Sequence, residues 1–132
     1  MLDRLTNGLD FQTQALLLRS ERQRMLAGNI ANADTPGYQS REFDFATALR
    51  AATDEREAKA AAGVPMSPEG LALSTRKYAV MAQTNLDSNG VDMDRERAAF
   101  ADNSLRYEAT LRFINSSVRT TLDAMRSHNA AV

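Results

Sequence analysis

At 132 residues the chain has the length of one domain, and its 16 Lys and Arg residues nearly balance its 17 Asp and Glu residues. This balance gives no strong attraction to nucleic acid or to an anionic membrane, and it argues against both as partners. Cysteine is absent, which excludes disulfides and thiolate metal sites. The longest apolar run is "ALLL" at 15–18, far short of the roughly 20 residues that cross a bilayer. The N-terminus lacks the pattern of a secretory signal, so we expect no cleaved signal peptide.

The first predicted element is an amphipathic helix from Leu9 to about Asn32. Its apolar residues fall on one stripe at steps of three and four or their multiples: Leu5, Leu9, Leu16, Leu26 and Ile30. Polar residues interrupt this stripe, so the helix is expected to need a partner. The segment Thr35-Pro36-Gly37-Tyr38 is predicted to end it, because proline biases the preceding residue away from helical angles. Proline and glycine at the two central positions favour a type II turn.

The middle of the chain gives weaker signals. After the turn, Phe43 and Phe45 alternate as in a short extended piece. Residues 46–63 are rich in Ala and charged residues and fit a nascent helix, but after Leu49 they contain almost nothing large enough to bury. We therefore expect 50–70 to be a mobile linker or a variable insert. Residues 71–93 fit either a short helix or an extended arm, and both readings stay open here.

The longest predicted helix runs from Asp94 to about Ser127. One stripe carries most of its large apolar side chains: Phe100, Tyr107, Leu111, Ile114, Val118, Leu122 and Met125. Carboxylates at its start and His128 at its end complement the helix dipole. Such a helix is about 50 Å long, whereas a compact globule of this size has a radius of gyration of about 14 Å. Its stripe therefore needs cover from the first helix, from other subunits, or from both.

Together these patterns predict a mainly α fold. The long N- and C-terminal amphipathic helices are expected to pair as a coiled coil, with an extended or irregular middle segment. The corresponding division of the chain is an N-terminal helix (1–34), a turn with an aromatic extended segment (35–49), a variable linker or arm (50–93) and a C-terminal helix (94–132). Packing within a subunit and assembly between subunits are assigned to the two apolar stripes.

One segment nearly fits a calcium-binding loop. Residues 85–96 place suitable side chains at positions 1, 3, 5, 6 and 12 of that motif: Asn85, Asp87, Asn89, Gly90 and Glu96. Position 1 is Asn rather than Asp, and Asp92 stands where such loops usually pack an aliphatic side chain. We therefore interpret the segment as a turn before a helix that Asp92 or Asp94 caps.

No other pattern indicates catalysis, a cofactor or a metal site. The chain has one histidine, His128, so neither a catalytic triad nor a histidine-rich metal site can form within it. Its carboxylate pairs lie in predicted turns or in the linker, where no apolar surround raises a pKa. We expect no catalytic, cofactor-binding or metal-ligating residues.

Residues 25–45, MLAGNIANADTPGYQSREFDF, resemble the N-terminal signature of the rod, hook and hook-associated proteins of the bacterial flagellum. That signature ends a helix with an Ala-Asn-x-x-Asn-x-x-Thr-x-Gly-[Tyr/Phe] pattern. The core at 29–38 matches it well, although Gly28 stands where the wider pattern usually has Asn. The segment "REFDF" that follows, and "NGVDMDRERAAFADNSLRYEATLRFI" at 89–114, look like the subgroup that forms the proximal rod. Residues 50–70 contribute nothing to the resemblance.

The resemblance implies a structural subunit of the flagellar basal body that serves motility and is not an enzyme. Members of the family are exported unfolded through the flagellum's own type III apparatus, without a cleaved signal peptide, and polymerise into a helical rod that crosses the periplasm. The implied partners are further copies of the chain, other rod proteins, the small rod-adaptor subunit, the membrane ring and the export gate. An isolated subunit is expected to leave both termini disordered until it docks.

The signature and the segment after it single out eight positions: Asn29, Asn32, Thr35, Pro36, Gly37, Tyr38, Phe43 and Phe45. We expect the turn to aim the chain away from the helical tube, and the aromatic residues to anchor the next segment against a neighbouring helix. The alternative is a local helix stop with the aromatic residues in the chain's own core, and the two readings are compatible. The two asparagines are expected to satisfy carbonyls at the helix end or to bond across subunits.

Two other classes of protein stay open at this point. A cytosolic coiled-coil adaptor or chaperone explains the helices but not the turn signature. An enzyme, such as a muramidase that opens the cell wall for the rod, needs a buried carboxylate pair, and the sequence offers none.

Overall fold

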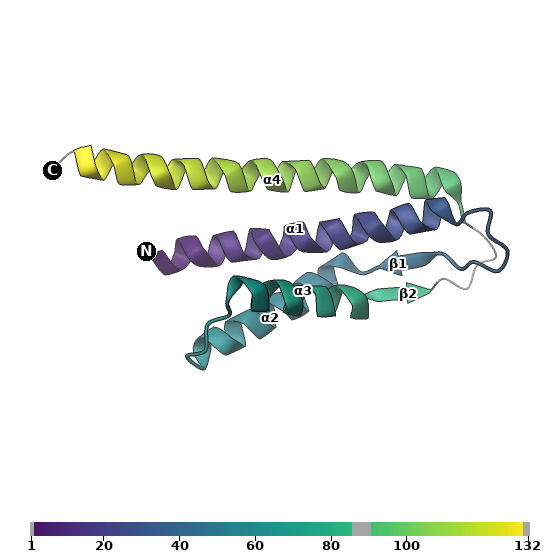
Figure 1. Cartoon of the computed structure of the whole chain (residues 1–132), viewed down its shortest axis with the longest axis horizontal. Helices are drawn as coiled ribbons and strands as arrows, with labels where there is room; N and C mark the ends of the chain where they lie inside the picture. The colour runs from purple at the N-terminus through teal and green to yellow at the C-terminus, as the bar shows by residue number, and fades with distance from the viewer. Residues whose placement is uncertain (1, 86–90, 131–132) are drawn as a thin grey trace.

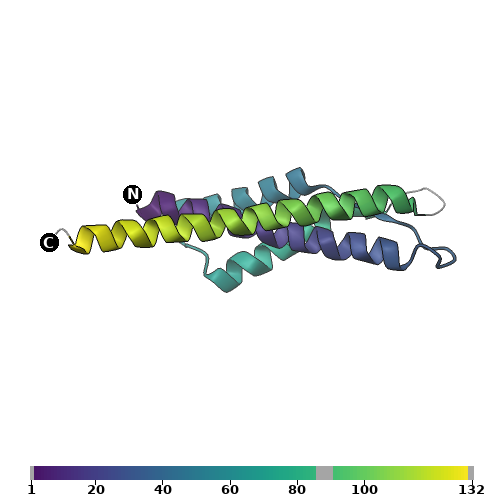
Figure 2. The same cartoon turned by 90° about the horizontal axis from the view of Figure 1, so that it is seen from above.

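The computed structural model describes residues 2–85 and 91–130, which form three layers (Figure 1). The elements in chain order are α1 (Leu2–Ala31), β1 (Arg41–Phe43), α2 (Phe45–Ala61), α3 (Pro68–Met81), β2 (Gln83–Asn85) and α4 (Met93–Ala130). Helix α4 lies along α1 in the opposite direction, and both termini lie at the same end of the molecule (Figures 1 and 2). The α2–α3 hairpin and the two strands cover the other side of α1. The mainly α prediction is confirmed.

Both long helices form close to the predicted places. Helix α1 begins at Leu2, earlier than its periodicity indicated, and α4 extends to Ala130. The type II turn is confirmed, because the Tyr38 amide donates to the Thr35 carbonyl at 3.2 Å and Gly37 has a φ of +76°. Asp92 caps α4 by accepting a bond from the Arg95 amide at 3.3 Å.

Helix α2 replaces much of the predicted linker. Its contact with α1 is made by small residues, since Ala48 and Ala52 are buried and the buried Gln14 donates from Nε2 to the Ala52 carbonyl at 3.1 Å. Small side chains let two helices approach closely, so this helix is held without the large apolar residues that its sequence lacks. The long side chain of Arg56 reaches the first turns of α1 and donates to the Asn7 carbonyl at 3.1 Å.

Helix α3 folds back on α2 to complete the hairpin. Ser67 caps it by accepting from the Gly70 amide at 3.0 Å, and Pro68 occupies its first turn. The Glu55 carboxylate of α2 accepts from the Ser74 hydroxyl at 2.8 Å and from the Lys77 ammonium at 3.2 Å. Of the two alternatives for residues 71–93, the described part contains both a helix, α3, and a short extended piece, β2. Asp87, Asn89 and Gly90 of the calcium-like segment lie outside the described residues.

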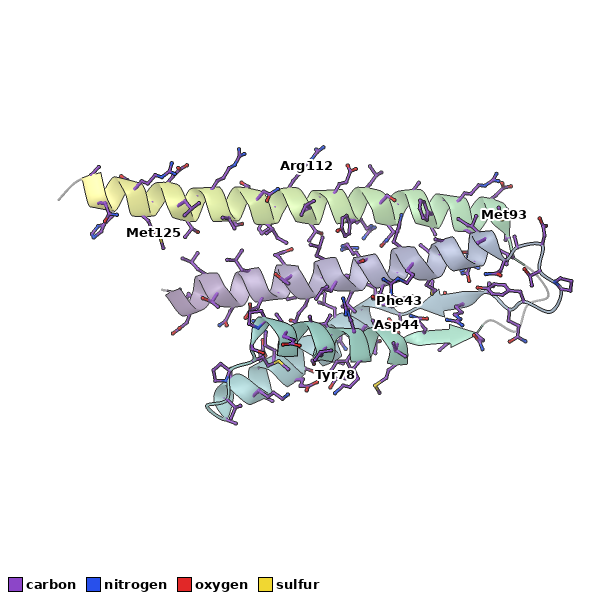
Figure 3. The ribbon with its side chains drawn as sticks, viewed as in Figure 1. Phe43, Asp44, Tyr78, Met93, Arg112 and Met125 are labelled. Atoms are coloured by element: carbon purple, nitrogen blue, oxygen red, sulfur yellow. The ribbon has the colours of Figure 1, made fainter. Side chains whose placement is uncertain are left out.

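The main apolar core lies between α1 and the hairpin layer. Its buried members come from α1, β1, α2 and α3: Leu18, Met25, Leu26, Phe43, Ala48 and Ala79. Strands β1 and β2 pair antiparallel, with Phe43 opposite Gln83, and this pairing brings Phe43 beneath α1 (Figure 3). The extended segment is thus short, because Phe45 already begins α2.

The hairpin contact predicts a pH-dependent stability. Hydrogen bonds from Tyr78 and Ser74 lower the pKa of Glu55 from 4.5 to about 2. Because the folded-state pKa is the lower one, the stabilisation is complete above pH 4.5 and is lost as the pH falls toward 2. Glu55→Gln should lower the thermal unfolding temperature at pH 7, and the gap to the parent chain should shrink between pH 4.5 and 2.

Circular dichroism melts at several pH values measure this gap. Glu69→Gln is the matched control, because Glu69 is an exposed carboxylate on the same hairpin. Parallel pH profiles for the parent and Glu55→Gln would show that the Glu55 contact does not stabilise the fold.

Candidate functional site

Asn29 occupies the last turn of α1 and is fully buried. Its Nδ2 donates to the Arg41 carbonyl at 2.9 Å and to Oε2 of Glu96 at 3.1 Å. Its Oδ1 accepts from the Tyr38 hydroxyl at 2.9 Å and from the Arg41 amide at 3.0 Å. One amide group therefore joins the end of α1 to the turn, to β1 and to the first turn of α4.

The other polar motif residues organise the helix end itself. Asn32 donates from Nδ2 to the Gly28 carbonyl at 2.8 Å, and its backbone amide donates to the same carbonyl at 3.0 Å. Thr35 donates from its hydroxyl to Oδ1 of Asn32 at 3.3 Å. Pro36 and Gly37 are exposed at the tip of the turn. These bonds are all local, whereas those of Asn29 reach distant parts of the chain.

The three aromatic residues after the turn lie against α1 of the same chain. Tyr38 is half-buried and bonded to Asn29, and Phe43 belongs to the core. Phe45 packs against that core, and the Arg19 guanidinium lies 4.4 Å from its ring centroid. The structure thus packs these aromatic residues against their own chain, with Phe43 buried in its core and Tyr38 and Phe45 partly buried.

The seam between α1 and α4 is polar at its centre. Among the described residues of α4, the buried ones are Glu96 and Asn103. Nδ2 of Asn103 donates to Oε1 of Gln23 at 2.7 Å and to the Arg19 carbonyl at 2.9 Å. Nε2 of Gln23 in turn donates to the Ser104 hydroxyl at 2.6 Å. The two long helices therefore pair as expected, but hydrogen-bonded polar side chains lie beside the apolar ones at the centre of this seam.

The apolar stripe of α4 runs from the seam, where Phe100 packs against the core, onto one flank of the helix pair. Phe100, Tyr107 and Ile114 are partly buried. The rest of the stripe is 40–50% exposed: Leu111, Val118, Leu122 and Met125. On α1 the stripe divides, since Leu26 is buried in the core while Leu9, Leu16 and Ile30 are only partly buried. The helix pair leaves much of its apolar surface without cover from its own chain.

Open grooves run between the two long helices. One of about 480 Å³ is lined by α1 and α4 residues: Ser20, Gln23, Arg24, Ala27, Phe100, Ser104, Tyr107 and Glu108. Another of about 540 Å³ lies near the termini, between Leu5 and residues of α4 that include Met125. Shallow grooves along a helix pair suit the side chains of another helix better than a small molecule.

The described residues offer little for other kinds of chemistry. They contain no group of three or more side chains placed to hold a metal ion. The carboxyl pKa values that shift, those of Asp44 and Glu55, are lowered by hydrogen bonds, the opposite of what a general acid at neutral pH needs. In the described part of the chain, no helix combines the length and apolarity of a bilayer crossing.

Sequence reasoning missed the buried polar residues of the seam. Gln23 is one of the polar residues that interrupt the predicted α1 stripe, and no role was predicted for Asn103. A signal was present, because Gln23 lies seven residues from both Leu16 and Ile30 and so shares their heptad line. A polar residue on such a line marks a buried polar contact in a helix pair.

Comparison with known proteins gives one consistent family. The family model described as "Flagella basal body rod protein" matches residues 9–39, which include most of α1 and the turn. The flagellar basal body rod protein FlgB of Proteus mirabilis (strain HI4320) is 43% identical over 96% of this chain and 98% of its own. FlgB of Escherichia coli (strain K12) is 42% identical over 98% and 100%, and FlgB of Buchnera aphidicola is 34% identical over 96% and 99%.

The Asn29 contacts predict a large loss of stability when that amide is removed. Asn29→Ala leaves the Tyr38 hydroxyl, the Arg41 amide and the Glu96 carboxylate without a bond they now make. We expect the free energy of unfolding to fall by about 2–4 kcal/mol, measured by urea denaturation. Asn32→Ala removes a more exposed local bond and should cost about 1 kcal/mol or less. Equal losses for the two variants would contradict the central role of Asn29.

Proposed function

Because the chain belongs to the FlgB family of flagellar basal body rod proteins, and is a structural subunit of the rod, we propose that it builds the proximal part of the rod. There it joins the membrane ring and the export gate to the distal rod and the hook. Its further partners are the other rod proteins and the rod-adaptor subunit. It acts without catalysis, and it reaches the periplasm through the flagellar type III apparatus without a cleaved signal peptide.

The exposed apolar side chains of α4 support this proposal, because they provide a surface through which subunits can associate. Leu111, Val118, Leu122 and Met125 remain 40–50% exposed in the chain alone, and they follow one flank of a helix of 38 residues. Full burial of each such side chain is worth about 1.5–3 kcal/mol. A continuous exposed row of this kind is a liability in a lone molecule and a suitable surface for association.

The occupant of this flank is the helix pair of a second copy of the chain. The flank is continuous with the α1–α4 seam, so an added helix extends an existing helix layer. Arg24 and Glu108 both border the groove of about 480 Å³ on this flank, which gives the rim charges of both signs. Leu9, Leu16 and Ile30 of α1 remain partly exposed and add to the same association.

The turn motif keeps the middle of the chain away from this surface. The Pro36-Gly37 turn sends the chain back along the hairpin side of α1, and Asn29 holds β1 there. In this scheme the terminal segments 1–34 and 94–132 assemble, 35–49 redirects the chain, and 50–93 forms an arm on the outer side. Termini that order fully only on docking remain a prediction of the scheme.

The association surface predicts an assembly defect that spares the fold. Val118→Gln with Leu122→Gln should abolish motility and remove the subunit from isolated basal bodies, because the flank loses apolar area. The circular dichroism spectrum of the isolated chain should not change, since both side chains are already 40–48% exposed. Ser116→Gln, at an exposed position two residues before Val118, is the control. Full motility in the double variant would overturn the proposed surface.

The turn predicts a separate defect. Gly37→Val should impair rod assembly and motility far more than export, because a β-branched residue is strained at a φ of +76°. Gly37→Asn is the matched control, since asparagine tolerates that backbone region, and it should retain most motility. Swimming assays and quantification of exported subunit separate the two effects. Similar motility for the Val and Asn variants would argue that the turn geometry is unimportant.

A further inference from the structure

Two lines of exposed side chains run along opposite sides of α4. In each line the residues recur every seven positions, so they share one direction on the helix. The Glu108 line contains Glu108, Asn115 and Leu122. The Arg106 line contains Arg106, Phe113 and Thr120. The two lines are two residues apart, which turns a helix by about 200°, so they point in nearly opposite directions. All six side chains are exposed.

The side of the helix pair that carries the Arg106 line has excess positive charge. Arg106 pairs with Asp102 at 3.0 Å. Arg19 of α1 lies near both, and its burial together with the positive charge of Arg106 and Arg22 lowers its pKa. Among the described residues, Nε of Arg19 has no hydrogen-bond partner. Arg19 and Arg106 therefore share the one Asp102 carboxylate and can accept another from outside.

An exposed aromatic patch follows this charge along the same side. Phe113 of α4 is 56% exposed and Phe11 of α1 is 39% exposed. Both line an open groove of about 320 Å³ between the two helices. This side of the helix pair thus offers positive charge at Arg106 and a large apolar surface one heptad further along α4.

The opposite side of α4 offers the complementary groups. Glu108 is exposed and forms no ion pair with any residue that the structure describes. Arg24 borders the same groove but pairs with Glu21 at 3.6 Å. Leu111 and Val118, both 40% exposed, each lie three residues beyond a member of the Glu108 line. This side therefore offers a free carboxylate followed by apolar side chains.

The matching groups also lie at the same height along α4. Glu108 and Arg106 differ by two residues, as do Leu111 and Phe113, and each step of two residues spans about 3 Å of the helix axis. A parallel copy set alongside with little axial shift therefore brings the carboxylate toward the guanidinium groups and the leucine toward the phenylalanine. Contact of two Glu108 lines in parallel would instead oppose two carboxylates.

We propose that copies of this chain join side by side through opposite flanks of α4, with the Glu108 line of one copy against the Arg106 line of the next. The inference rests on the proposed function, and it adds which face of the second copy covers the apolar stripe. Because the two faces differ, each copy keeps a free face after joining, so the contact can repeat around a helix. Charged pairs across such a contact fix its register.

The absence of cysteine allows a direct test of which faces meet. Asn115→Cys marks the Glu108 line, and Thr120→Cys marks the Arg106 line. The two single variants are produced together in flagellated cells that lack the parent chain, and isolated basal bodies are treated with a short bismaleimide. This reagent is needed because five residues span about 7.5 Å, beyond the reach of a disulfide. We expect a cross-linked dimer at least about fivefold more abundant than from either variant alone.

Each other outcome has a defined meaning. Equal dimer yields from either variant alone would show that like faces meet, and a cross-link to a protein of another mass would show a different occupant. Either result, or no cross-link, overturns the inference but leaves the proposed function intact, because the chain is still found in basal bodies. Absence of the parent chain from basal bodies would refute the proposed function and the inference with it.

An exchange of charges gives a second, independent test. Glu108→Arg and Arg106→Glu should each lower the amount of the chain in basal bodies, by at least about fivefold, and together should restore most of it. The two side chains point in opposite directions within one chain, so recovery must come from contact between copies. Glu108→Arg with Arg119→Glu is the matched control, because exposed Arg119 lies three turns further along α4, and it should not recover. Equal failure of both combinations would overturn the inference.

Discussion

Helix α1 is the element on which the other parts of the structure depend, because it packs against the hairpin layer on one side and against α4 on the other. On one side, Leu18, Met25 and Leu26 join the apolar core beneath the helix. On the other side, Gln23 and the Arg19 carbonyl bind Asn103 of α4. Asn29 sits at the end where the two surfaces meet and bonds to both β1 and α4. The α2–α3 hairpin, strand β1 and helix α4 all contact this one helix.

The contrast between the two sides of α1 explains how a small chain folds and still has surface left for assembly. Each of the α4 stripe residues would contribute about 1.5–3 kcal/mol if fully buried. A polar group left buried without a partner costs about 1–3 kcal/mol, and each bond that is made returns only about 0.5–1.5 kcal/mol net. The hydrogen bonds of the seam therefore offset the cost of burying its polar groups. The exposed part of the stripe is left without cover, and burying it in an assembly is favourable.

The sequence allowed the long helices and the Pro36-Gly37 turn to be predicted, because heptad-like periodicity and turn chemistry are local signals. Helix α2 was missed because alanines such as Ala48 and Ala52 pack it closely against α1, and small residues leave no periodic pattern of large ones. The Ser67-Pro68 cap of α3 was a usable signal that was overlooked. The motif identified Asn29 as important, but its bond to Glu96 joins residues 67 positions apart, which no local pattern predicts.

Hydrogen exchange measured on the free chain and on isolated basal bodies tests this account most directly. Amides of α1 between Gln14 and Asn29 should be protected in both states, because this stretch holds the helix's buried side chains, from Gln14 and Leu18 to Asn29. Amides of α4 between Leu111 and Met125 should exchange readily in the free chain and become strongly protected in the rod. Equal protection of that α4 segment in both states would contradict an outward stripe that is covered only on assembly.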